Sequence, residues 1–322
     1  LATIDGERIA GGKDFDPDTG LLSRANAVLL DEERARSLAQ RLQGVPFTVL
    51  STDEKPYTQA PPAPFITSTL QQEANRKLRF DARRTMRAAQ RLYENGYITY
   101  MRTDSVVLSE EALRGARRTV ESLFGPEFLP AAPRVYTGRV KNAQEAHEAI
   151  RPAGEAWATP ESLAATLDSD EQRVYDLIFK RTLASQMKDA RGRRLTARIG
   201  AAVTGWSPAA GGDAAGGDAS VRREVVFQAG GSTVDFPGFL RVYREGTDED
   251  ADGNGGGGES VLPPIRQGER VTPRRLEAEG HMTQPPPRLS EAALIKSLEE
   301  SGIGRPSTYA SIIDTILRRE YT

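Results

Sequence analysis

Residues 70–100 read LQQEANRKLRFDARRTMRAAQRLYENGYITY, a pattern that predicts a helix, a short turn, a second helix and then a strand. Residues 294–321, LIKSLEESGIGRPSTYASIIDTILRREY, can be laid over this stretch, with Thr308 taking the place of Thr85 at the start of the second helix. A helix–turn–helix followed by a strand is the outline of a winged helix, which is common among DNA-binding domains. Two unrelated helical hairpins would explain the pattern equally well.

The residues on either side of this stretch predict a strand-rich unit that is interrupted by a helical unit. A second helical unit follows. Helices are expected at 32–42 (capped by Asp31), 67–77, 83–95, 110–123, 161–167, 171–187 and 291–301. Strands are expected at 1–9, 47–50, 97–100, 194–199, 221–227, 232–236 and 270–271. Residues 208–220 and 246–259 read as Gly-rich and Asp-rich insertion loops.

These elements predict an α+β, multidomain fold. The predicted domains are the first part of a strand-rich domain at 1–62, a helical domain at 63–190, the second part of the strand-rich domain at 191–276, and a partial helical domain at 277–322. The chain begins at Leu1 and stops at Thr322, directly after a predicted helix, so we expect it to be a fragment of a longer protein.

The composition excludes several classes of site. The 322 residues include no Cys and 2 His, which excludes disulfides, zinc ribbons, iron–sulfur clusters, Cys nucleophiles and multi-histidine metal sites. Lys+Arg number 43 against 45 Asp+Glu, and most of the basic residues are arginine, whose planar fork suits phosphate. No apolar run approaches the roughly 20 residues that span a membrane. No P-loop or dinucleotide-binding glycine motif supports ATP or NAD dependence.

The first candidate site is Gly96–Ser105, GYITYMRTDS. In an extended chain, alternate residues face the same way, so Tyr100, Arg102 and Asp104 are expected on one side. A guanidinium beside a phenol favours the phenolate, which makes Tyr100 a candidate nucleophile, and the same Arg102 could hold the oxygens of a phosphoryl group under attack. The alternative is a structural contact between a Tyr and an Arg at the edge of a sheet.

The second candidate site is residues 141–152, KNAQEAHEAIRP. His147 and Arg151 are four residues apart, which would place two donors on one helical face. If Asp104 accepted a hydrogen bond from His147, the imidazolium would be favoured and could bind a phosphate. The alternative is a surface or core histidine, and too few carboxylates lie nearby for a metal site.

The third candidate site is residues 281–291, HMTQPPPRLSE, where a proline run would fix how Gln284 and Arg288 are presented. After the helix capped by Ser290, residues 301–309 read SGIGRPSTY and predict a Gly-flanked turn into a further helix. Arg305 and Ser307 lie at this turn, where N–H groups at a helix start can bind a phosphate. The alternative is a turn with a good helix cap.

Two charged stretches complete the set of candidates. A basic run covers residues 76–91 and is either a solvated helix face or a surface that follows a nucleic-acid backbone. Asp14, Asp16 and Asp18 do not predict a calcium loop, because Ala25 occupies the position that needs a bidentate Glu.

Five motifs, taken together, resemble the type IA DNA topoisomerases and, among them, the bacterial topoisomerase I group. They cover most of the chain in the same order: PFITSTLQQ (64–72), ITYMRTDS (98–105), AQEAHEAIRP (143–152), TQPP (283–286) and GIGRPSTY (302–309). Met101 is typical of topoisomerase I, whereas the related topoisomerase III group has proline there.

The resemblance implies roles for the candidate residues. Tyr100 would attack single-stranded DNA to form a 5′-phosphotyrosine, with Arg102 stabilising the phosphoryl charge. His147, oriented by Asp104, would bind the DNA backbone, and Arg151, Gln284, Arg288, Arg305 and Ser307 would also bind DNA. The implied fold is an arch in which a strand-rich gate domain carries helical, winged-helix-like domains. The implied substrate is negatively supercoiled DNA, relaxed without ATP.

The sequence departs from the family by omission, because the TOPRIM domain and its carboxylates that bind Mg²⁺ are not found. We therefore expect a monomeric chain that binds no metal itself, belongs to a bacterial nucleoid enzyme in the cytoplasm, and is inactive without the remaining domains. The competing interpretation is a non-catalytic winged-helix protein that binds duplex DNA.

Overall fold

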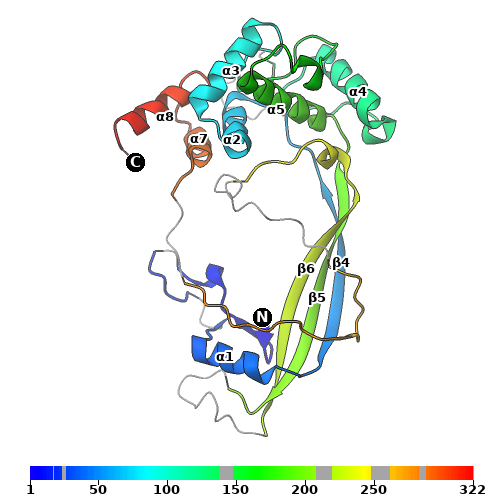
Figure 1. The fold of residues 1–322 in the computed structure, drawn as a ribbon, viewed down its shortest axis with the longest axis vertical. Helices are drawn as coiled ribbons and strands as arrows, with labels where there is room; N and C mark the ends of the chain where they lie inside the picture. The colour runs from blue at the N-terminus through cyan, green and yellow to red at the C-terminus, as the bar shows by residue number, and fades with distance from the viewer. Residues whose placement is uncertain are drawn as a thin grey trace. The chain divides into compact units, whose positions relative to one another are not determined.

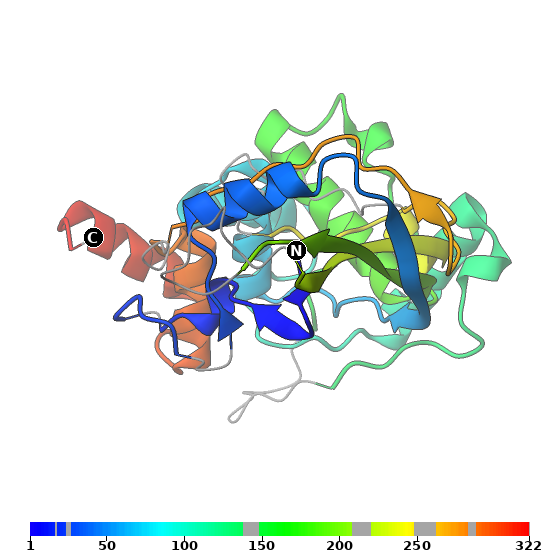
Figure 2. The same ribbon diagram turned by 90° about the horizontal axis from the view of Figure 1, so that it is seen from below.

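The computed structural model describes residues 1–16, 18–23, 27–137, 148–207, 220–247, 262–282 and 288–321 (Figures 1 and 2). Contacts divide the chain into two compact units. The strand-rich unit consists of Leu1–Tyr57, Arg193–Thr233 and Gly258–Arg288, and the helical unit consists of Thr58–Gly192, Val234–Gly257 and Leu289–Thr322. Both units are therefore assembled from stretches that are distant in the sequence, and the C-terminal helices belong to the helical unit.

The strands of the described residues form one sheet in the order β3-β2-β1-β6-β5-β4-β7. Their bounds are β1 Thr3–Ile4, β2 Glu7–Ile9, β3 Ala27–Val28, β4 Phe47–Gln59, β5 Ala190–Thr204, β6 Arg222–Phe236 and β7 Arg270–Val271. The long strands β4, β5 and β6 lie side by side (Figure 1). β1 pairs antiparallel with both β2 and β6, and β2 pairs parallel with β3.

The core of the strand-rich unit lies between this sheet and helix α1 (Glu32–Arg41). Leu38 of α1 packs in one cluster with Phe47, Trp206 and Val225, all of them buried. Asp31 caps the helix as predicted, because its carboxylate accepts a hydrogen bond from the backbone N–H of Arg34.

Several predicted strands have other bounds in the structure, among them the strand expected at 194–199, which is β5. The strand expected at 1–9 is a hairpin, because Asp5 and Gly6 both have positive φ and form a tight turn. The strands expected at 221–227 and 232–236 are one continuous strand, β6, which runs through Gly230 and Gly231. The strand expected at 47–50 extends to Gln59 along its neighbours.

The helical unit contains the remaining helices of the described residues. They are α2 Thr67–Leu78, α3 Ala82–Glu94, α4 Glu110–Phe124, α5 Ser169–Ser185, α7 Glu291–Glu300 and α8 Tyr309–Arg318. One apolar cluster holds α2 to α5 together and includes Leu70, Leu92, Val120 and Ile178, each fully buried. None of the described helices has the length and apolar character needed to cross a membrane.

The starts and ends of these helices follow their caps. Helix α3 begins at Ala82, one residue before the predicted start, because Asp81 caps it, and Thr85 donates its hydroxyl to the Asp81 carbonyl within the first turn. The helix expected at 161–167 is only a 3₁₀ turn, Glu161–Leu163. No strand forms at 97–100 in the described chain. A single antiparallel bridge joins Ile98 to Pro152 instead.

The internal repeat is visible in the structure as two helical hairpins, α2–α3 and α7–α8. The first hairpin has positive φ at Arg79 after its first helix and at Gly96 after its second, and the other hairpin has positive φ at Gly302 and Glu320. The hairpins pack on one another, α7 against α2 and α8 against α3 (Figure 1). The helical part of the predicted winged-helix outline is therefore present twice, without a strand after either hairpin in the described residues.

Candidate functional site

The chain that carries Tyr100 is fixed on its N-terminal side by residues 149–153. The Thr99 N–H donates to the Arg151 carbonyl over 2.9 Å, and the Thr99 hydroxyl donates to the Ala149 carbonyl over 2.7 Å. The same hydroxyl accepts the Arg151 N–H over 3.0 Å, and the Ala153 N–H donates to the Tyr97 carbonyl over 2.9 Å. Residues 97–99 therefore have a fixed backbone although they belong to no strand.

The same chain is fixed on its C-terminal side by Thr67, the first residue of α2. The first N–H groups of a helix have no partner within the helix, and that of Thr67 donates to the Thr103 carbonyl over 3.0 Å. The Thr67 hydroxyl lies 2.8 Å from the Met101 carbonyl and accepts the Thr103 N–H over 2.9 Å. Tyr100 thus lies between two anchored positions, Thr99 and Met101.

The side chains of this segment alternate in burial from Tyr100 onward. Tyr100 is 43% exposed and Arg102 is exposed, whereas Met101 is 4% exposed and Thr103 is 2% exposed. The Tyr100 ring meets the ring of Tyr93 edge to face, with centroids 5.2 Å apart. Arg102 makes no hydrogen bond or ion pair with the part of the chain that is described. A solvent-accessible phenol therefore lies two residues from a guanidinium with open donors.

Asp104 continues this segment toward α7 and α8. It lies close enough to Tyr309, the first residue of α8, to act on its phenol. Burial, the charge of Glu299 and that of Asp104 raise the pKa of Tyr309, against an opposing effect of Arg305. Asp104 and Arg305, predicted from separate motifs, are therefore brought around the same phenol. Neither Tyr309, the last residue of the GIGRPSTY motif, nor Glu299 is among the predicted site residues.

The Arg151 side chain is buried and its donors are bound within the chain. It is 5% exposed and forms a bidentate pair with Glu148, with both N···O distances 2.9 Å. Its other donors reach the carbonyls of Pro152 and Gly154 and, at 3.4 Å, the Ser109 hydroxyl. All five N–H donors are thus used within the chain, so in this arrangement Arg151 positions the backbone that fixes Thr99.

Glu148 also ties this region to α4. It accepts the backbone N–H of Ser109, the residue that caps α4, over 2.8 Å. Burial acts to raise the pKa of Glu148, but the hydrogen bonds from Arg151 and Ser109 outweigh it, so the pKa is lowered. The carboxylate therefore stays ionised over the physiological range and holds Arg151 in place.

The turn between α7 and α8 contains Gly302 and Gly304 because its backbone has positive φ at both positions. Gly302 and Gly304 have φ of 71° and 86°, and a Cβ on Gly304 would lie 3.1 Å from the Tyr309 ring. Arg305 and Ser307 are exposed at this turn. The helix itself begins at Tyr309, later than expected, because the Thr308 hydroxyl accepts the Arg305 N–H and closes a turn first.

The other predicted site residues fall into two groups. Arg288 is described and exposed. His147 and Gln284 lie outside the described residues, so the predicted hydrogen bond between Asp104 and His147 stays a prediction.

The basic run at 76–91 is largely used within the helical unit. Ion pairs join Arg76 and Lys77 to Glu73, Arg83 to Asp314, Arg84 to Asp170, and Arg91 to Asp168 and Glu171. Arg87 is exposed and, in the described chain, has no such partner. These pairs favour packing of α2, α3, α5 and α8 as the main role of the run.

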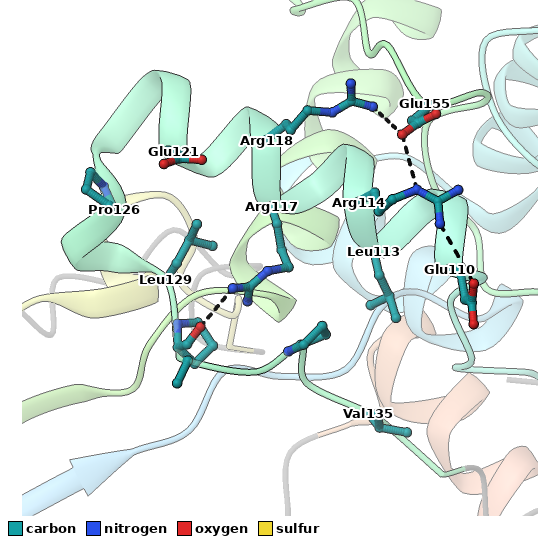
Figure 3. A pocket seen from close by; sticks show the side chains of 13 residues that line it. Glu110, Leu113, Arg114, Arg117, Arg118, Glu121, Pro126, Leu129, Val135 and Glu155 are labelled. Carbon is teal, nitrogen blue, oxygen red and sulfur yellow. Dashed lines mark hydrogen bonds and ion pairs between the residues drawn. The ribbon is translucent and has the colours of Figure 1, made fainter.

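A cavity of about 980 Å³ lies on the outer side of α4 and does not include the Tyr100 segment (Figure 3). It is lined by the apolar side chains of Leu113, Leu129 and Val135 together with the arginines of α4. Two of these arginines, Arg114 and Arg118, point to Glu155 and pair with it.

No cluster of three or more metal-ligating side chains occurs in the described part of the chain. Asp104 and Glu299, the acidic groups near Tyr309, do not by themselves make a magnesium site, which needs several oxygen ligands around the ion.

A model of the DNA topoisomerase family matches residues 12–322, and the chain belongs to this family. DNA topoisomerase 1 of Mycolicibacterium smegmatis is 55% identical over 322 residues, which is 100% of this chain and 33% of that protein. DNA topoisomerase 1 of Synechocystis is 48% identical, with the same coverage. The chain thus spans about a third of the length of the curated relatives it matches.

The fold is also similar to a solved structure, that of full-length topoisomerase I from Thermotoga maritima. The two are 32% identical with a TM-score of 0.69, and the match covers 92% of this chain and 44% of that one. The predicted α+β fold of a type IA topoisomerase is therefore confirmed.

Proposed function

We propose that this chain carries the nucleophile of a type IA DNA topoisomerase and that this nucleophile is Tyr100. The observation that supports it is an exposed phenol on a backbone fixed at Thr99 and Met101, two residues before Arg102, whose guanidinium has no hydrogen bond or ion pair among the described residues. A fixed backbone matters because a nucleophile must hold its attack geometry.

In this proposal, the Tyr100 phenolate attacks a phosphodiester of single-stranded DNA. A bond forms between the phenolic oxygen and phosphorus, the bond from phosphorus to the 3′ oxygen breaks, and that oxygen takes up a proton. Arg102 stabilises the charge on the phosphoryl oxygens. The products are a 5′-phosphotyrosine and a free 3′-hydroxyl. The phosphotyrosine bond lets the 3′-hydroxyl reseal the strand after strand passage without ATP.

The remaining candidate residues are proposed to hold the DNA. Arg288, Arg305, Ser307, Gln284 and His147 would contact the backbone of the single strand, with Asp104 orienting His147. Arg151 would act indirectly, through the backbone that fixes Thr99. The substrate of the whole protein would be negatively supercoiled DNA, acted on by a monomer in the cytoplasmic nucleoid of a bacterium.

Magnesium is proposed to be supplied by parts of the protein other than this chain. The chain by itself would accordingly neither cleave nor relax DNA efficiently, consistent with its length of about a third of the relatives. Magnesium-dependent relaxation of supercoiled plasmid by the isolated chain would contradict this proposal.

The nucleophile is tested by placing the chain in DNA topoisomerase 1 of Mycolicibacterium smegmatis in place of its 55% identical counterpart. Incubation with end-labelled single-stranded DNA should give a covalent adduct that is lost in Tyr100→Phe and kept in Tyr93→Phe, the neighbouring exposed phenol. An adduct that persists in Tyr100→Phe would refute the role of Tyr100. Sequence-specific duplex binding without any adduct would support the winged-helix alternative, which the family match does not favour.

A further inference from the structure

The backbone on the C-terminal side of Tyr100 depends on one buried hydroxyl. Thr67 is fully buried, and its hydroxyl lies 2.8 Å from the Met101 carbonyl and 3.0 Å from the Thr103 carbonyl, and accepts the Thr103 N–H over 2.9 Å. Its own N–H donates to the Thr103 carbonyl. Residues 101–103 lie 34 to 36 positions along the chain from Thr67, so this contact is tertiary.

We infer that Thr67 is a positioning residue for the reaction: its hydroxyl holds residues 101–103 so that Tyr100 and Arg102 stay presented together. The inference rests on the proposed role of Tyr100 and adds a residue that touches neither DNA nor the reacting atoms. Without the hydroxyl, the Thr103 N–H and the Met101 carbonyl would be buried with a partner missing, a loss that drives local rearrangement.

The position of the contact explains why this rearrangement would reach the reacting groups. Met101 and Thr103, the two residues bound by Thr67, stand on either side of Arg102 along the chain. Arg102 makes no hydrogen bond or ion pair within the described residues that could fix it. The orientation of its guanidinium toward a phosphate at Tyr100 therefore depends on the backbone that Thr67 holds. Thr99 holds the opposite side through separate partners, so the loss of Thr67 would loosen one side only.

The test compares Thr67→Val, which keeps the shape and removes the hydroxyl, with Thr67→Ser, which keeps the hydroxyl. The matched control is Thr182→Val in α5, a fully buried threonine whose hydroxyl donates to the Ile178 carbonyl over 2.8 Å, away from the segment. In the isolated chain, amide exchange at residues 101–104 should rise about tenfold in Thr67→Val. Thr67→Ser and Thr182→Val should leave exchange there unchanged.

The second measurement is the rate of adduct formation at saturating labelled DNA, made in the Mycolicibacterium smegmatis chimera described above. Thr67→Val should slow this rate about 10- to 100-fold with the Kd for the same oligonucleotide unchanged, because misplacement affects attack more than binding. Thr67→Ser should restore most of the rate.

The outcomes separate this inference from the proposed function. Two outcomes would overturn the inference about Thr67 and leave the proposed function standing. One is unchanged amide exchange at residues 101–104 in Thr67→Val. The other is an unchanged adduct rate in Thr67→Val while Tyr100→Phe abolishes the adduct. Faster exchange throughout the helical unit with a fall in Tm would make Thr67 a general folding residue and would also overturn it. An adduct that persists in Tyr100→Phe would instead overturn the proposed function.

Discussion

Ser68 on α2 donates a 2.8 Å hydrogen bond to Glu299 on α7, and within the described residues no arginine or lysine pairs with this partly buried carboxylate. A second carboxylate on α7 is placed in the same way, since Glu291 accepts the Ala82 N–H at the start of α3 near the charge of Asp81. The two helical hairpins are therefore joined by the Arg83–Asp314 ion pair and by two carboxylates, Glu291 and Glu299, that have no cationic partner among the described residues.

Replacing Glu299 with Gln should strengthen this docking. The amide oxygen can still accept from Ser68, while the charge that is costly to bury is removed. We expect α7 and α8 to gain about 0.5–1 kcal/mol of protection from amide exchange. Glu111→Gln, at an exposed position on α4, is the control and should change nothing there. Weaker protection in Glu299→Gln would show that the negative charge itself is stabilising.

The same docking should weaken as the pH rises. Burial raises the pKa of Glu291 and of Glu299, and nearby Asp81 and Glu300 add to the effect. A group whose pKa is higher in the docked state favours docking when protonated, so this contribution is complete below pH 4.5 and is lost as the pH rises through the raised values. Amide exchange in α7 and α8, corrected for its intrinsic pH dependence, should show less protection at pH 7 than at pH 5. Equal protection would contradict the assignment.

Breaking the Arg151–Glu148 pair should destabilise the helical unit. Arg151→Gln leaves a partly buried carboxylate without its partner, and we expect a loss of about 3 kcal/mol in the free energy of unfolding at pH 7. Because the pKa of Glu148 is lowered, the contribution of the pair is present above the ordinary Glu pKa and is lost as the pH falls through the lowered value. Urea unfolding of wild type and variant should therefore converge in acid.

The two glycines between α7 and α8 should differ in their tolerance of alanine. Both have positive φ, which costs a residue with a Cβ about 1–2 kcal/mol. Gly302 has no atom within 4 Å of an added Cβ, whereas at Gly304 the Cβ would also press on the Tyr309 ring. Gly304→Ala should therefore lower the unfolding free energy more than Gly302→Ala, as measured by urea titration. Equal losses would show that the ring moves aside easily, and a larger loss in Gly302→Ala would contradict the prediction.

Arg102 should matter for chemistry and not for stability. Since it is exposed and unpartnered in the described chain, Arg102→Gln should change the unfolding free energy by less than about 0.5 kcal/mol. In the chimera it should slow adduct formation about 100- to 1,000-fold, the range for one lost transition-state donor. Arg87→Gln, equally exposed, should instead weaken DNA binding and reduce its salt dependence, with the rate at saturation unchanged. A normal rate in Arg102→Gln would remove it from the catalytic group.

Helix caps and the alternation of side chains depend on residues close in the sequence, so they could be predicted from the sequence alone. The caps at Asp31 and Ser290 were evident because a short polar residue precedes a periodic helical stretch, and the structure places both as expected. The alternation of Tyr100, Arg102 and Asp104 also needed only an extended backbone, which the burial of Met101 and Thr103 bears out. The hairpin at Asp5-Gly6 also has a local signal in the sequence, because an Asp-Gly pair favours a tight turn between strands.

What could not be predicted depends on contacts between distant residues. Nothing around Thr67 indicates that its hydroxyl binds the chain near Met101, because that contact exists only once α2 is packed. Arg151 was assigned to DNA from its motif, and only the fold shows that its donors are taken by Glu148 and nearby carbonyls. The arginines of α3 likewise reveal their acidic partners only through the packing of α5 and α8.

The hairpins α2–α3 and α7–α8 pack on one another within a single chain, as two copies of one protein pack in a homodimer. Because both halves belong to one polypeptide, separation and rejoining are unimolecular and independent of protein concentration. The tether keeps the local concentration of one hairpin near the other at the millimolar level, even for a weak contact. A rise in pH, which ionises Glu291 and Glu299, would therefore loosen the two hairpins without dispersing them.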